Sequence, residues 1–308
     1  MKCKYPYTGN NCSITYLDYL KENGNYNSYL YVQYFYLIGS SITLLLSSYL
    51  FYMSYKKRES YLQKVTYLSC LFVSVLFTIR GIDPESYGDI IPKIINQLCW
   101  DISTSLLYTV LYTYLFYMIK SLDKYNKNLL FIKLTINIMT FITWILCILS
   151  SFLQTYLDNR KIFRSLKLIC LSVILVILTS LINRYNYKIY KVINVIECNK
   201  NEGSKRISNK IIFISILLNV LSLLTVTFQL YSSYLIFKNN NLSRLPTEGF
   251  RFPMFGLLQY LVIVFLLLTY KKKYIGNKIS NFFKCYGEKK ISEIELSNIS
   301  IKETSINI

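Results

Sequence analysis

Residues 80–125 contain the stretch that decides the fold, and they read RGIDPESYGDIIPKIINQLCWDISTSLLYTVLYTYLFYMIKSLDKY. A short loop comes first, with three acidic residues and two of the five prolines of the chain. A long apolar segment follows, and its first third contains a single carboxylate, Asp101. An apolar run of about 18 or more residues is long enough to cross the hydrocarbon core of a membrane. The stretch therefore predicts a polar turn followed by a membrane-spanning helix.

The composition extends this prediction to most of the chain. Hydrophobic residues make up 53% of the 308 residues, and the mean hydropathy is +0.33. A soluble protein of this length needs a polar surface that this chain lacks. We therefore expect an all-α, polytopic membrane protein, folded as a bundle of seven transmembrane helices. The expected spans are residues 29–55, 61–79, 94–119, 129–153, 165–183, 210–237 and 253–270.

These spans divide the chain into three regions. Residues 1–28 are expected to form an outer N-terminal segment, and residues 29–270 the transmembrane domain. Residues 271–308 are expected to form a cytosolic amphipathic helix and a disordered tail. The first region lacks the apolar core of a cleaved signal peptide, so the first helix is expected to direct membrane insertion.

The basic residues predict the orientation. The net charge is +19, but the Lys and Arg side chains lie between the apolar runs, which indicates membrane topology and not nucleic-acid binding. Most of the 35 basic residues fall in the first, third and fifth connections and in the tail. The positive-inside rule then places the N-terminus outside and the C-terminus in the cytosol. The fourth connection opposes this assignment, because it holds Arg160, Lys161, Arg164 and Lys167.

Three modification sites follow from this orientation. Asn11 and Asn241 begin Asn-x-Ser sequons on the expected outer side, where each is either glycosylated or unused. Cys285 follows the expected amphipathic helix, and it is either palmitoylated or an unmodified cysteine.

The sequence offers little that is typical of an enzyme. It contains no histidine, which removes the commonest general base and zinc ligand. The eight cysteines form no CxxC pair, and no hydrolase, metalloprotease or phosphate-binding motif is present. We therefore expect a non-enzymatic protein without a metal or another cofactor.

Asp101 is the one acid well inside a predicted span. Because an ionised carboxylate facing lipid costs at least about 2.5–3.5 kcal/mol, Asp101 is expected to face the bundle interior. Helical spacing places Ser105 and Tyr108 on the same face as Asp101, so the three residues form a polar stripe. Three glutamines lie at comparable depth in other spans. The stripe and the glutamines define either a ligand pocket open to the outside or a set of interhelical hydrogen bonds. No partner cation for Asp101 is evident in the sequence, which favours hydrogen bonds. The pocket candidates are Asp101, Ser105, Tyr108, Gln33, Gln229 and Gln259.

The loop at the start of residues 80–125 contains three acidic residues, Asp83, Glu85 and Asp89. They lack the spacing of a metal site, so we expect a solvated loop. Pro84 is expected to end one helix, and Pro92 to precede the next.

The third span is followed by Asp123-Lys124-Tyr125, which is similar to the Asp-Arg-Tyr motif of rhodopsin-like G-protein-coupled receptors. This resemblance makes the three residues candidates for coupling to a G protein. The chain departs from that family elsewhere, because it lacks Asn-Pro-x-x-Tyr in the seventh span and Cys-Trp-x-Pro in the sixth.

A second resemblance involves the quoted loop itself. Arg80, Ile82-Asp83-Pro84, Tyr87-Gly88 and Pro92, with Ser105-Leu106-Leu107-Tyr108 beyond them, resemble the signature of the tobamovirus-multiplication-protein family of seven-helix proteins. The distantly related orphan-receptor-like proteins of lysosomes share its general plan. The resemblance implies an endomembrane or vacuolar protein without enzymatic activity, which recruits small GTPases or other cytosolic partners.

Three functions therefore stand as hypotheses. The first is a receptor-like scaffold of an endomembrane, vacuolar or lysosomal membrane that recruits partners through basic cytosolic loops. The second is a G-protein-coupled receptor for an unknown ligand at the plasma membrane. The third is a transporter that uses Asp101.

Overall fold

The structure is a computed structural model that describes residues 7–8, 13–22, 26–57, 61–122, 129–156, 160–197, 202–238 and 260–262. Within these ranges almost every residue is helical. The long helices are α2 (Tyr26–Lys56), α3 (Tyr61–Ile82), α4 (Lys93–Leu122), α5 (Leu129–Tyr156), α6 (Arg160–Glu197) and α7 (Glu202–Lys238). The short elements are β1 (Tyr7–Thr8), β2 (Ile14–Thr15), α1 (Tyr16–Glu22) and the 3₁₀ turn η1 (Pro84–Ser86).

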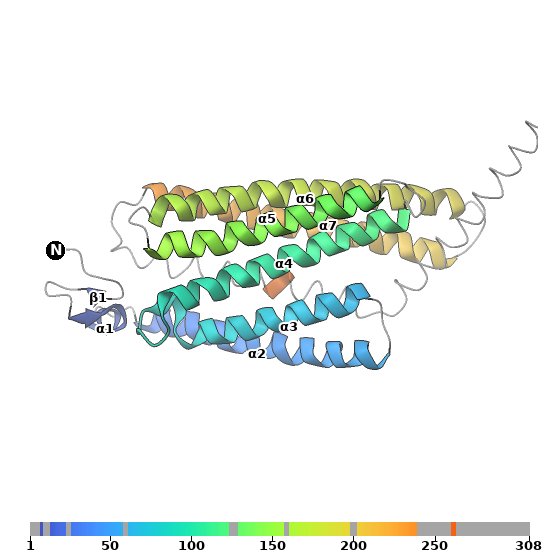
Figure 1. Cartoon of the computed structure of the whole chain (residues 1–308). Coiled ribbons are helices and arrows are strands. Elements are labelled where there is room, and N and C mark those ends of the chain that lie inside the picture. The colour runs from blue at the N-terminus through green and yellow to red at the C-terminus, as the bar shows by residue number, and fades with distance from the viewer. Residues whose placement is uncertain are drawn as a thin grey trace, which may run out of the picture.

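The long helices lie side by side in one elongated bundle (Figure 1). Each contacts its neighbours in the chain, and α4 also contacts α6. In Figure 1, α4 runs obliquely between the pair formed by α2 and α3 and the group formed by α5, α6 and α7. The central position of α4 lets its polar side chains reach several other helices.

Six of these helices are long and apolar enough to cross a membrane. They correspond to the first six predicted spans and show that the chain is an all-α polytopic membrane protein. Of the seventh predicted span, 253–270, the structure describes only residues 260–262. The helix α6 continues past the end of the fifth predicted span at residue 183 and through residues 184–197, as the helical spacing of RYNYKIYKVINVIE predicts.

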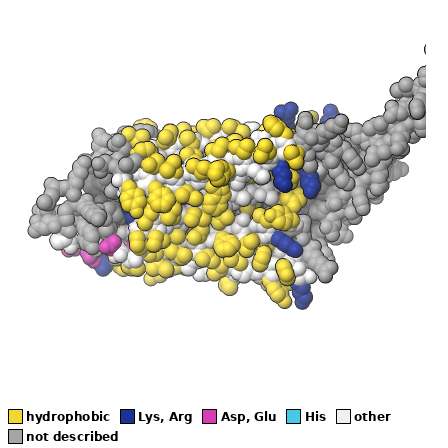
Figure 2. Space-filling model, viewed as in Figure 1, with side chains coloured by type: hydrophobic (Ala, Val, Ile, Leu, Met, Phe, Trp, Pro, Cys, Tyr) yellow, Lys and Arg dark blue, Asp and Glu magenta, His cyan; other side chains and the backbone are white. Residues whose placement is uncertain are grey.

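The surface of α2 shows how the bundle suits a lipid environment. Most of its outward side chains are large and apolar, including Ile38, Ile42 and Leu45, whereas Thr43 and Ser47 are buried. Small hydroxylated residues let helices approach closely and hydrogen-bond across their contact. Apolar side chains cover the middle of the face shown in Figure 2.

Exposed tyrosines mark the edges of this apolar band. Tyr31 and Tyr34 project near the start of α2, and Tyr52 and Tyr55 near its end. At about 1.5 Å per residue, Tyr31 and Tyr52 are about 31 Å apart along the helix. This distance matches a hydrocarbon core of about 30 Å, at whose borders tyrosine is enriched.

The N-terminal segment places a small capped helix beside the bundle. Tyr7–Thr8 pairs antiparallel with Ile14–Thr15, and Thr15 begins α1 as its N-cap. The Asp18 backbone N–H donates to the Thr15 hydroxyl at 3.1 Å, and that hydroxyl donates to the Asp18 carboxylate at 2.6 Å. The bond from Thr15, together with Lys21, holds the pKa of Asp18 below its ordinary value.

Candidate functional site

Asp101 lies in the third turn of α4, about 12 Å along the helix from Lys93 at about 1.5 Å per residue. Its side chain is almost fully buried, with 1% exposed. As the sequence predicts for a carboxylate inside a span, it points into the bundle and away from lipid. The groups that face it come from α5, from α6 and from α4 itself.

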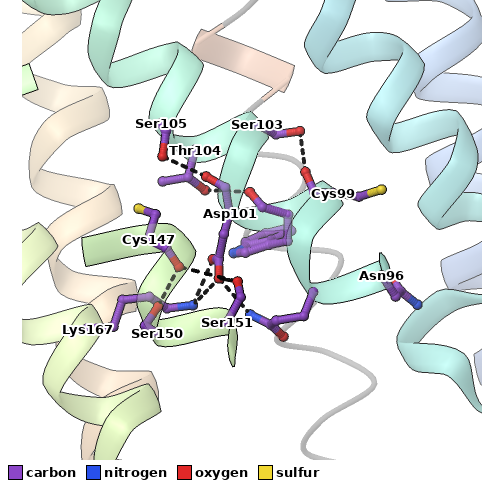
Figure 3. Close-up of polar contacts among 12 residues, drawn as sticks. Asn96, Cys99, Asp101, Ser103, Thr104, Ser105, Cys147, Ser150, Ser151 and Lys167 are labelled. Atoms are coloured by element: carbon purple, nitrogen blue, oxygen red, sulfur yellow. Dashed lines mark hydrogen bonds and ion pairs between the residues drawn. The ribbon is translucent and has the colours of Figure 1, made fainter. Parts of the chain in front are cut away.

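The carboxylate of Asp101 forms a buried ion pair with Lys167 of α6. The Lys167 ammonium donates to the two carboxylate oxygens at 2.8 and 3.1 Å. The Ser151 hydroxyl of α5 donates to the same carboxylate, and so does Gln97 Nε2 of α4 at 3.2 Å. Figure 3 shows Asp101, Lys167 and Ser151 converging from three helices. We call Asp101, Lys167, Ser151 and Gln97 the acid–lysine cluster.

The electrostatics of the acid–lysine cluster favour a structural role. Taking two ions out of water costs several kcal/mol each, and the pair must recover this through mutual attraction and added hydrogen bonds. Here the opposite charges cancel, and the neutral donors Ser151 and Gln97 engage the carboxylate further. The arrangement therefore ties α4, α5 and α6 together without burying net charge.

The sequence did not reveal Lys167 as the partner of Asp101. From the sequence we assigned Lys167 to the basic residues of the fourth connection, and no partner cation for Asp101 was evident. The structure corrects this, because α6 begins at Arg160 and Lys167 lies two turns inside it with 4% of its side chain exposed. The sequence feature that could have indicated this ion pair was a lysine just inside a predicted span, at the same end of the bundle as Asp101.

Two other pocket candidates bind the stretch of α6 that follows Lys167. The Tyr108 hydroxyl donates to the Leu171 carbonyl oxygen at 2.8 Å. The next residue, Ser172, donates its hydroxyl to Gln229 Oε1 of α7, also at 2.8 Å. The α6 stretch from Lys167 to Ser172 thus contacts Asp101 and Tyr108 of α4 and Gln229 of α7, so residues on three helices meet there.

The remaining described candidates make local contacts. The Ser105 hydroxyl donates to the Asp101 carbonyl oxygen of its own helix at 2.9 Å. Gln33 of α2 donates to the Ile82 carbonyl oxygen of α3 at 2.8 Å, in a different interhelical contact from that of Asp101. Each described candidate therefore has a hydrogen-bond partner within the protein.

Several predicted sites lie outside the described residues. They are the pocket candidate Gln259, the coupling candidates Asp123, Lys124 and Tyr125, the sequons at Asn11 and Asn241, and the lipidation candidate Cys285.

The loop between α3 and α4 contains a second buried polar cluster, formed around Asp83. Its carboxylate accepts backbone N–H bonds from Gly88 at 2.9 Å and from Ile90 at 2.9 Å, with a longer one from Ile91 at 3.3 Å. The Tyr29 hydroxyl of α2 also donates to it, at 3.0 Å. The prediction of a solvated loop is thus wrong for Asp83, whose side chain is fully buried, although Asp89 is exposed. Sequence reasoning missed this role because the three acids look equivalent when only their spacing is considered.

Arg80 and Asn96 connect the ends of the two helices that flank this loop. Arg80 Nη1 donates to the side-chain and main-chain oxygens of Asn96, each at 3.1 Å. Asn96 Nδ2 in turn donates to the Asp83 carbonyl oxygen at 2.7 Å. The Arg80 guanidinium lies 4.8 Å from the ring centroid of Trp100, a cation–π contact. These contacts fix where α4 starts and therefore the depth of Asp101.

The two prolines act as the sequence predicts. The helix α3 ends at Ile82, two residues before Pro84, and α4 begins at Lys93, directly after Pro92. Within the described ranges, no three His, Cys, Asp or Glu side chains lie close enough together to hold a metal ion.

Comparison with protein-family models and with curated proteins found no match for this chain. Architecture and contacts are therefore the basis for any functional assignment.

Proposed function

We propose that the protein is a non-enzymatic, receptor-like scaffold with seven membrane-spanning helices. In this proposal its basic connections and tail face the cytosol and recruit cytosolic partners of the small-GTPase class. The N-terminal segment faces the lumen or the outside of an endomembrane, vacuolar or lysosomal compartment. The family resemblance in the loop around Asp83 motivates the choice of partner and of membrane.

The observation that carries the proposal is the difference in charge between the two ends of the bundle. One end, which we call the basic end, holds Lys56, Lys57, Lys64, Lys120, Lys133, Arg184, Lys188 and Lys191. Among the side chains that the structure describes, no acid lies at this end, whereas exposed Asp18, Glu22 and Asp89 lie at the other. On the face drawn in Figure 2, acidic side chains are visible only at the other end, where some basic side chains lie beside them, and further basic side chains gather at the basic end. By the positive-inside rule, this distribution supports a cytosolic basic end.

The length of α6 supports a role in binding partners. Its 38 residues span about 57 Å, against about 30 Å for the hydrocarbon core. Lys167 sits near the opposite end of α6, so the excess length projects from the basic end. Such an extension offers a helical surface beyond the headgroups.

Residues 260–262 support a seventh helix that closes the bundle. The Tyr260 hydroxyl donates to the Tyr36 carbonyl oxygen of α2 at 3.1 Å. Its ring also lies edge-on to Phe77 of α3, with centroids 5.3 Å apart. A helix through these residues would lie against α2 and α3, as a seven-helix arrangement requires.

Location and partners can be tested together in cells with a full-length copy tagged at the C-terminus. Neutralising basic residues between the fifth and sixth predicted spans with Lys200→Gln, Lys205→Gln and Arg206→Gln should abolish co-purification of small GTPases. The matched control removes the same charge between the sixth and seventh predicted spans, with Lys238→Gln, Arg244→Gln and Arg251→Gln, and should leave co-purification intact.

Three results would contradict the proposal. They are a tag accessible from outside intact cells, a copy found only at the plasma membrane, and equal partner recovery with both triple variants.

A further inference from the structure

The basic end presents its cations at the edge of the apolar band, where lipid headgroups lie. We propose that this end binds the headgroups of anionic phospholipids through two clusters of side chains. The hairpin cluster comprises Lys56, Lys57 and Lys64, and the α6 stripe comprises Arg184, Lys188 and Lys191. Binding of lipid headgroups goes beyond the recruitment of cytosolic proteins, because it involves the membrane itself and requires no soluble partner.

The depth of the hairpin cluster follows from the tyrosines of α2. Exposed Tyr52 and Tyr55 mark the border of the hydrocarbon core, and Lys56 and Lys57 follow directly in the chain. Both lysines are exposed. Their ammonium groups therefore lie at the level of lipid phosphates, within reach of charge-assisted hydrogen bonds.

Lys64 joins the hairpin cluster from the first turn of α3. Its ammonium lies 5.5 Å from the ring centroid of Tyr55, a cation–π contact between α3 and α2. Tyr55 itself is 72% exposed. The contact holds a third, half-buried cation against an exposed ring that directly precedes Lys56 in the chain.

The α6 stripe places three cations on one helical face. Arg184, Lys188 and Lys191 follow an i, i+4, i+7 spacing, and all three are exposed. Like charges at this spacing repel one another and destabilise a helix. An external anion on this face would remove the repulsion, and a row of phosphates in a leaflet supplies several at once.

Within the described residues, the protein provides no acid of its own at this end. Exposed Lys120 on α4 and Lys133 on α5 add cations on further helices, so the positive charge is spread around the bundle. A soluble acidic protein would cover one face, whereas lipids surround every helix. The distribution therefore fits an anionic leaflet, to which each basic residue near the surface contributes about 1 kcal/mol.

The test uses purified full-length protein in nanodiscs of phosphatidylcholine, with or without phosphatidylserine. Lipids retained after gentle extraction are counted by native mass spectrometry at low and high salt. The wild type should retain phosphatidylserine in preference to phosphatidylcholine, and salt should reduce the preference.

Two triple variants locate the contacts. One carries Lys56→Gln, Lys57→Gln and Lys64→Gln, and the other carries Arg184→Gln, Lys188→Gln and Lys191→Gln. Each neutralised residue should lower the preference about fivefold, the equivalent of about 1 kcal/mol. The control removes the same charge at the opposite end, with Lys21→Gln, Lys93→Gln and Arg164→Gln, and should keep the preference.

Equal retention of the two lipids by the wild type would overturn the proposal. A control variant that loses as much preference for phosphatidylserine as the two triple variants would overturn it as well. Because the assay contains no cytosolic protein, it can fail while the scaffold function holds. Conversely, loss of GTPase recovery in cells would leave the lipid preference unchanged.

Discussion

The Asp101 carboxylate accepts hydrogen bonds from Gln97 on its own helix, from Ser151 on α5 and from Lys167 on α6. An ion pair of this kind adds less stability than its geometry suggests, because both ions first lose their hydration. Removing one partner is more costly, since the other is left as an uncompensated buried charge. The two members of the pair therefore depend on each other.

Breaking this pair at either residue should destabilise the bundle. Asp101→Asn or Lys167→Met should each lower the free energy of unfolding by about 3–5 kcal/mol, because each leaves one buried charge unpaired. The double variant Asp101→Leu, Lys167→Met should recover most of the loss, since no buried charge remains. Thermal unfolding in detergent measures all three.

The control for this series is Asp89→Asn, at an exposed loop position. A double variant as unstable as the sum of the single variants would show that the two side chains act independently. In that case the acid–lysine cluster would not behave as one unit.

At the scale of elements, the connection between α3 and α4 is held by a side chain that satisfies several backbone groups. Asp83 accepts the backbone N–H groups of Gly88, Ile90 and Ile91, which lie in a turn without regular structure. Ser86 and Asp89 adopt left-handed backbone conformations there, with φ of 58° and 57°. Such conformations cost energy for non-glycine residues, and surrounding contacts must compensate for it.

Asp83→Ala should release this connection. Buried backbone donors without an acceptor cost about 1–3 kcal/mol each. The Asp83 bond to Ile91 is buried and those to Gly88 and Ile90 are partly buried, so the free energy of unfolding should fall by about 2 kcal/mol. Amide hydrogen exchange at Ile90 and Ile91 should accelerate. The exposed Asp89→Ala serves as the comparison and should change exchange at these amides much less; equal acceleration by both variants would rule out a special role for Asp83.

At the scale of the whole molecule, Tyr260 joins a segment late in the chain to the first two long helices. Its ring reaches α2 where Gly39 leaves space, and a Cβ added at Gly39 would lie 2.9 Å from Tyr260 Cε2. A real Cβ atom is not found that close to a ring carbon, so one of the two groups would have to move. The glycine thus permits the close approach of the two segments.

A double-mutant cycle at Gly39 and Tyr260 tests this contact. Gly39→Ala should destabilise the wild type through the clash and should cost much less in a Tyr260→Ala background. The interaction energy should fall in the range of about 0.5–3 kcal/mol measured for residues in contact. Strictly additive effects on thermal unfolding would show that Tyr260 does not pack against α2.

The sequence by itself determined the helical, membrane-spanning character of this protein. An apolar run of sufficient length must form a helix in lipid, because every backbone polar group has to be satisfied within the segment. Pro84 and Pro92 mark the helix ends for equally local reasons. Properties that depend on one segment at a time were therefore predictable.

Only the tertiary structure decided which polar groups meet. Asp101 and Lys167 are separated by 66 residues, and their pairing depends on the rotation and depth of α4 relative to α6. Asp83 and Asp89 are similar in sequence context, yet one is buried and the other exposed because the path of the loop turns one carboxylate inward. Periodicity places a residue on a face of its helix, but the neighbour of that face is set by packing of the whole bundle.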